Sequence, residues 1–97
     1  MKLITKEVEK ITPNLYETEN VPTLERKITA KFFTPDSGWT WYMTEYDPVR
    51  RLAFGLVVGM ETEWGYFSLD ELESVTGPFG LPVERDIHFG TKLVSEV

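Results

Sequence analysis

The residues best suited to catalysis or metal binding lie near the C-terminus, where Glu84, Asp86 and His88 occupy alternating positions. A regular strand would place all three on one face at steps of about 6 to 7 Å, which lines up two carboxylates and an imidazole. Paired carboxylates of this kind can hold magnesium or manganese for hydrolysis. The further oxygen ligands would come from acidic residues expected near turns: Asp36, Glu45, Asp47, Glu61 and Glu63. A solvated strand face, neutralised by Arg85 and nearby lysines, explains the same spacing without a metal.

Side chains for covalent catalysis or phosphate binding lack their usual sequence surroundings. None of the serines lies in a Gly-x-Ser-x-Gly segment, and the single histidine, His88, has no neighbouring triad signature. No Gly-x-Gly-x-x-Gly or Gly-Lys-Ser/Thr segment occurs. The chain has no cysteine, which excludes a disulfide framework, a thiolate zinc site and a cysteine nucleophile. We therefore expect no bound cofactor.

Aromatic residues suggest a second kind of site, because flat rings stack on both sugars and bases. Trp64, expected in a turn, and Tyr42, expected on the outer face of a hairpin, are the candidates for such stacking. Trp39 and Trp41 are expected in the core instead. The lysines expected beside Tyr42 are too few to follow a phosphate backbone.

The element expected to organise these residues is a β-hairpin, in which apolar and polar residues alternate on both sides of the turn signal 34–37. A four-residue loop there pairs three apolar residues of each arm: Phe32 with Trp39, Ala30 with Trp41, and Ile28 with Met43. All six then share one core-facing side. A shift of one residue would bury the charge of Lys31 among aromatic rings, so we prefer the first register.

The remaining elements follow from caps and turn residues. We expect a helix from the Thr5 cap to before Pro13, a loop over 16–25, a central strand over 52–59, a turn over 61–65, a short strand at 66–67, a helix from the Ser68–Glu71 capping box to Gly77-Pro78, and a last strand over 83–89. The central strand has one flat face of small residues, against which a helix or a partner could pack closely.

Length and charge limit the fold and the compartment. We expect a single domain over residues 1–97, of the α+β class, with an antiparallel sheet of about four or five strands and two short helices packed on one face. The net charge of −6 opposes nucleic-acid binding. No signal peptide or membrane span is expected, which predicts a soluble cytoplasmic protein. An exposed edge strand would allow a homodimer as well as a monomer.

Four sequence blocks, in order along nearly the whole chain, carry a family resemblance. They are residues 32–42 followed by Glu45 and Asp47, residues 54–61, residues 65–72 and residues 80–86. Together with the opening Leu-Ile-Thr-Lys-Glu, they resemble the bacterial domain-of-unknown-function family 2958. The resemblance implies short proteins carried by plasmids, integrative conjugative elements and phage-like islands. Anti-restriction factors, transfer accessories and defence inhibitors occur in that setting, and several act by binding.

These observations favour an accessory protein of a bacterial mobile element that binds a protein partner without catalysis. Anti-restriction or anti-defence factors are examples of such proteins. An acidic, aromatic-edged surface is expected to bind the partner: Asp36, Glu45, Asp47, Glu61, Glu63, Trp64 and Tyr42. One alternative is a metal-dependent hydrolase that uses Glu84, Asp86 and His88. The other is a carbohydrate or nucleotide binder that uses Trp64 and Tyr42. Neither direct nucleic-acid binding nor membrane binding is expected.

Overall fold

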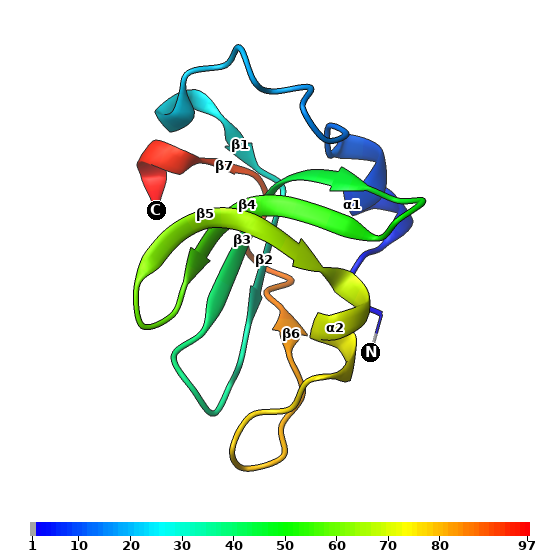
Figure 1. Ribbon diagram of the computed structural model, residues 1–97, viewed down its shortest axis with the longest axis vertical. Coiled ribbons are helices and arrows are strands. Elements are labelled where there is room, and N and C mark those ends of the chain that lie inside the picture. The colour runs from blue at the N-terminus through cyan, green and yellow to red at the C-terminus, as the bar shows by residue number, and fades with distance from the viewer. Residues whose placement is uncertain (1) are drawn as a thin grey trace.

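The computed structural model describes residues 2–97, which form one five-stranded antiparallel sheet, one two-stranded sheet and two short α-helices (Figure 1). The strand order of the larger sheet is β5-β4-β3-β2-β6. Its strands are β2 (Ala30–Phe33), β3 (Thr40–Asp47), β4 (Leu52–Val58), β5 (Thr62–Ser68) and β6 (Glu84–Arg85). The smaller sheet pairs β1 (Lys27–Ile28) with β7 (Lys92–Leu93). The predicted α+β class is confirmed, and the antiparallel sheet, predicted to have about four or five strands, has five.

Both faces of the larger sheet carry an apolar cluster, because its side chains alternate between the faces. The main cluster joins strand residues to residues of both helices: Leu3, Val8, Ala30, Phe32, Met43, Tyr46, Ala53, Phe67, Leu69, Leu72 and Val83. The smaller cluster contains Ile28, Phe89 and Val94. Tyr42 and Trp64 pack against it on the sheet face opposite the main cluster. The short β1–β7 sheet and the C-terminal segment thus cover part of the face opposite the main core.

Each α-helix begins at the residue that its sequence predicts. The Thr5 hydroxyl accepts from Val8 N–H at 3.2 Å and caps α1 (Lys6–Ile11), which ends before Pro13. The Ser68 hydroxyl accepts from Glu71 N–H at 3.2 Å and caps α2 (Leu69–Ser74). The second helix ends at Ser74 rather than at Gly77, so residues 75–83 form the loop to β6. Single turns of 3₁₀ helix lie at η1 (Thr23–Glu25) and η2 (Val94–Glu96).

The predicted hairpin of β2 and β3 forms, but the predicted register is wrong by two residues. Phe32 pairs with Trp41, and Ala30 pairs with Met43. The connecting loop therefore has six residues, from 34 to 39, instead of four. A shift of two residues keeps every side chain on its original face, so Phe32 and Met43 are buried as predicted.

The altered register moves two residues away from their predicted places. Trp39 lies outside the ladder, in the loop, with 42% of its surface exposed instead of buried in the core. The main chain of Thr34 closes the loop by donating to the carbonyl of Trp39 at 3.1 Å. Ile28 pairs with Lys92 in the smaller sheet rather than with Met43.

Two further predictions along the chain are wrong. The expected turn at 61–65 is shorter, because Gly59 N–H donates to the carbonyl of Glu61 at 3.0 Å and β5 starts at Thr62. The expected last strand over 83–89 stops at Arg85. There Asp86 accepts from His88 N–H at 3.0 Å and turns the chain out of the sheet.

The flat face of β4 is covered from within the chain. Ala53 is fully buried in the main core. A Cβ atom at Gly55 would overlap the carbonyl oxygen of Tyr42, and one at Gly59 would overlap the ring of Trp39. The small residues therefore do permit close packing, but with the same chain rather than with a partner. Gly55 packs against β3, and Gly59 packs against the ring of Trp39.

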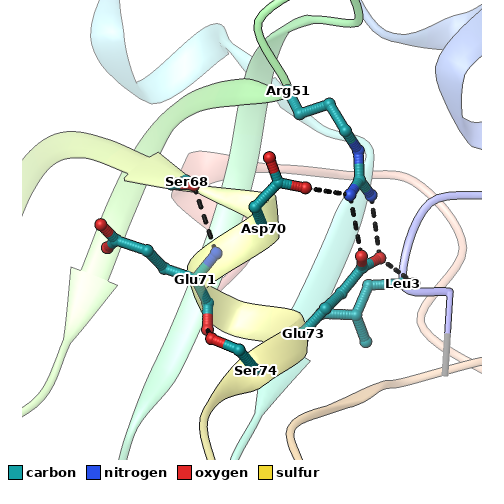
Figure 2. Close-up of polar contacts among 7 residues, drawn as sticks. All are labelled: Leu3, Arg51, Ser68, Asp70, Glu71, Glu73 and Ser74. Atoms are coloured by element: carbon teal, nitrogen blue, oxygen red, sulfur yellow. Dashed lines mark hydrogen bonds and ion pairs between the residues drawn. The ribbon is translucent and has the colours of Figure 1, made fainter.

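A charged cluster ties the β3–β4 turn to α2 and to the N-terminal segment (Figure 2). Arg51 forms a two-pronged ion pair with Glu73, at 2.8 and 2.9 Å, and a second ion pair with Asp70. The Glu73 carboxylate also accepts from Leu3 N–H at 2.9 Å. Hydrogen bonds from Arg51 lower the pKa of Glu73. The cluster thus joins three segments that are far apart in sequence.

Among residues 2–97, no helix has both the length and the apolar character needed to cross a membrane.

Candidate functional site

The acidic residues that were predicted to form one surface lie in different places. Asp36 belongs to the β2–β3 loop, whereas Asp47 ends β3 at the opposite end of that strand. At about 3.3 Å per residue, the two ends of β3 are roughly 20 Å apart. Asp47 is bound locally, because its carboxylate accepts from Val49 N–H at 2.9 Å and pairs with Arg50 at 2.7 Å. Arg50 also lowers the pKa of Asp47.

Glu45 is buried, with 4% of its surface exposed. Its carboxylate accepts from the N–H groups of Tyr16 and Thr18 at 2.9 and 3.0 Å, and from the Thr18 hydroxyl. These bonds hold Tyr16 at a φ of 70°, a conformation that non-glycine residues rarely adopt. The geometry gives Glu45 a role in anchoring the loop after α1.

The predicted stacking residues Tyr42 and Trp64 lie on the sheet face opposite the main core, and both are partly buried. The Trp64 ring stacks on Phe54 at 5.9 Å, and Arg26 lies 6.0 Å from its centroid. The Tyr42 ring lies 6.0 Å from that of Phe89. Both residues therefore stack mainly on side chains of the chain itself.

A hollow of about 280 Å³ lies on the same face, lined by Tyr16, Glu19, Arg26, Glu45, Phe54 and Tyr66. The hydroxyl of Tyr66 donates to that of Tyr16 at 3.1 Å, and this hydrogen bond raises the pKa of Tyr66. Trp64 and Tyr42 do not line the hollow.

The predicted metal ligands Glu84, Asp86 and His88 are not aligned on a regular strand, because β6 contains only Glu84 and Arg85. Asp86 instead approaches Lys31 at 3.9 Å and caps the turn that contains His88. Across residues 2–97, no three His, Asp or Glu side chains gather in an arrangement that could hold a metal ion.

An exposed apolar surface lies where three loops come together at one end of the sheet, the lower end in Figure 1. The loops are β2–β3 (34–39), β4–β5 (59–61) and α2–β6 (75–83). We call this the loop-end surface and define it by the residues that it exposes or that line its hollows: Trp39, Trp41, Val57, Met60, Glu61, Glu63, Val75, Pro78, Phe79 and Leu81. Met60 and Phe79 are 96% and 84% exposed.

Trp39 lies at the centre of this surface, because it lines two hollows. One hollow, of about 480 Å³, is bounded by Trp39, Val57, Met60, Glu61 and Glu63. The other, of about 380 Å³, lies between the β2–β3 and α2–β6 loops: Thr34, Ser37, Trp39, Trp41, Val75, Thr76, Gly77 and Pro78. The Trp39 ring stacks on that of Trp41 at 6.0 Å and covers Gly59. The sheet therefore supports the exposed indole.

Asp36 joins two of the loops that form the surface. Its carboxylate accepts from the N–H groups of Phe79 and Leu81 at 2.8 and 3.4 Å. Its other oxygen lies against Gly77, where a Cβ atom would overlap it. Asp36 thus positions the α2–β6 loop, and Gly77 provides the space for its carboxylate.

Of the predicted binding residues, the structure brings Glu61 and Glu63 to the loop-end surface, with Asp36 beneath it. Sequence reasoning missed Met60, Val75 and Phe79. The sequence did contain a signal for their exposure, because large apolar residues stand beside turn-forming Gly and Pro in Gly59-Met60 and in Gly77-Pro78-Phe79-Gly80. Such residues have little chance of burial in a short turn, so their exposure could have been inferred.

Comparison with known proteins identifies the family. The sequence model of the family described as "Protein of unknown function (DUF2958)" matches residues 3–96, so the chain belongs to this family. No curated protein and no solved structure matches the chain.

Proposed function

For this member of an uncharacterised family, we propose a non-catalytic function: the loop-end surface binds a protein segment that combines a large apolar side chain with lysine or arginine. The observation that carries the proposal is the exposed indole of Trp39 between two hollows, with Glu61 and Glu63 bounding one of them.

The apolar part of the surface favours a protein partner. Large apolar side chains that are exposed together, next to hollows, are typical of interaction sites. Tryptophan is among the residue types enriched at the positions that dominate binding energy at protein interfaces. Here Trp41 and Gly59 support the Trp39 ring, so little side-chain freedom is lost when a partner covers it.

The charge of the surface favours a basic segment of that partner. Glu61 and Glu63 are exposed, and they form no side-chain hydrogen bond or ion pair within the described chain. Neither hollow beside Trp39 is lined by a lysine or arginine. The net charge of −6 adds long-range attraction for cations and repels nucleic acid.

The setting that the family resemblance implies is consistent with this proposal. An accessory protein of a plasmid or a conjugative element would act in the bacterial cytoplasm, on a protein of the host or of the element. Anti-restriction or anti-defence activity would follow where that partner belongs to a defence system.

A library of random peptides displayed on phage tests the proposed chemistry directly. Selection on the immobilised protein should enrich peptides that place an aromatic or large aliphatic residue next to lysine or arginine. Trp39→Ala should lose these peptides, because it removes the central contact. Tyr16→Ala, which removes an exposed ring from the opposite face, should retain them. Enrichment of acidic peptides, or equal binding to both variants, would contradict the proposal.

A further inference from the structure

Strand β5 forms one edge of the larger sheet, and its main-chain groups face outwards in a defined pattern. Leu69 N–H donates to the carbonyl of Arg51, and Gly59 N–H donates to that of Glu61, both at 3.0 Å. Both pairs continue the β4–β5 register, so the odd-numbered residues of β5 exchange hydrogen bonds with β4. The N–H and C=O groups of Thr62, Trp64 and Tyr66 therefore point away from the sheet.

This edge lacks most of the features that usually prevent strand pairing, and its one charged residue is Glu63. It contains no proline and no lysine, and the β4–β5 pairing runs through all seven residues of β5 without a bulge. The opposite edge differs, because β6 is only two residues long and follows Pro82. Within residues 2–97, no group forms a hydrogen bond with the outward main-chain atoms of Trp64 or Tyr66.

We propose that β5 pairs with β5 of a second copy of this chain, in antiparallel orientation about a twofold axis at Gly65. A twofold axis makes the same surface its own partner, so the outward groups of both copies match. Trp64 of each copy then lies opposite Tyr66 of the other, and each such pair exchanges both main-chain hydrogen bonds. The two larger sheets join into one continuous sheet.

Side-chain chemistry supports a second copy as the occupant of this edge. In this register Glu63 lies opposite Phe67 of the second copy, so no carboxylate faces another carboxylate directly. Trp64 and Tyr66 form cross-strand aromatic pairs, which stabilise antiparallel sheets. Pairing about Gly65 also includes all seven residues of β5, the largest overlap that the strand allows.

A single cysteine at the axis tests both the pairing and its register. The two Gly65 residues would form a pair without mutual hydrogen bonds, whose Cα atoms lie about 4.5 Å apart, within the range that a disulfide spans. A Cβ atom at Gly65 meets no other atom within 4 Å, and the natural chain has no cysteine. Under mild oxidation, Gly65→Cys should form a covalent dimer at a concentration at which Gly38→Cys stays monomeric.

Gly38 is the matched control because its Cβ position is equally open but lies in the β2–β3 loop. Equal rates of cross-linking in the two variants would overturn the proposal. Light scattering of the natural protein should likewise give twice the monomer mass of 11.2 kDa. A monomer mass throughout a dilution series would also overturn it.

Tyr66→Pro provides a second variant, since it removes an outward N–H but no hydrogen bond to β4. It should shift the mass to that of the monomer while circular dichroism still reports the sheet. A variant that keeps the sheet and remains dimeric would contradict pairing through this edge. These experiments do not involve the proposed partner, so their outcome is independent of the proposed function.

Discussion

Single side chains join segments of this protein that are far apart in sequence, and the carboxylate of Glu73 shows how such a contact depends on pH. Arg51 and Leu3 both bind it (Figure 2). Because the folded state lowers the pKa of Glu73 below the ordinary 4.5, the contact stabilises the fold fully above that pH. The stabilisation is lost as the pH falls through the lowered pKa.

We predict that Glu73→Gln lowers the free energy of unfolding by about 1 to 2 kcal/mol near neutral pH, after allowance for solvent screening. The variant should also lose less stability than the natural protein on acidification, because its side chain does not titrate. Urea denaturation over a pH series measures both effects. Arg50→Ala, a change at the exposed neighbouring arginine, is the control and should leave the acid dependence linked to Glu73 in place. Parallel acid curves for Glu73→Gln and the natural protein would refute the assignment.

Two glycines on adjacent strands form a natural matched pair, since Gly55 and Gly65 are partners in the β4–β5 register. A Cβ atom at Gly55 would overlap a main-chain oxygen of β3, whereas one at Gly65 would meet open space. We predict that Gly55→Ala prevents stable folding, while Gly65→Ala leaves the melting temperature unchanged or raises it. Similar melting temperatures for the two variants would show that the β3–β4 approach is looser than described.

At the scale of elements, local sequence signals predicted the helix starts, because a cap acts within a few residues. Thr5 and Ser68 cap their helices where expected. The alternation of apolar residues also predicted which face of the hairpin is buried. Its register could not be derived in this way, since alternation has a period of two and a shift of two residues satisfies it equally.

The conformations of the loops depend on contacts between residues far apart in sequence, which no local sequence pattern reveals. The β2–β3 loop extends to Trp39, whose ring covers Gly59 on β4, and its Asp36 binds N–H groups 43 and 45 residues further along the chain. The sequence suggested Asp36 as a surface ligand, but its partner is an internal loop. Glu61 and Glu63 are both exposed, but only Glu61 lies in the turn where both were predicted, because β5 begins at Thr62.

The contact between Asp36 and the α2–β6 loop leads to a prediction at the same scale. Asp36→Ala should increase the hydrogen-exchange rates of the Phe79 and Leu81 amides by about tenfold or more, because both lose a charge-assisted hydrogen bond. Amide exchange measured by NMR provides the test, with the α1 amide of Val8 as an internal control. Unchanged exchange at Phe79 would mean that the loop is held without Asp36.

For the whole molecule, the fold places three loops at one end of the sheet and leaves strand β5 at one edge (Figure 1). The loops expose apolar side chains beside two carboxylates that form no ion pair within residues 2–97. The edge exposes main-chain hydrogen-bonding groups. A dimer through β5 would carry two loop-end surfaces. This arrangement could not be predicted from the sequence, because it depends on which loops the strand order brings together.

The central claim is that the loop-end surface binds a protein, and affinity capture from a lysate of bacteria that carry this family tests it most directly. Three folded proteins are compared: the natural chain, the double variant Glu61→Lys/Glu63→Lys, and the charge-matched control Glu9→Lys/Glu25→Lys. Glu9 and Glu25 are exposed and lie outside the loop-end surface. We predict a partner that the natural chain and the control retain and that the Glu61/Glu63 variant loses. A partner that all three retain equally, or none retained by the natural chain, would contradict the claim.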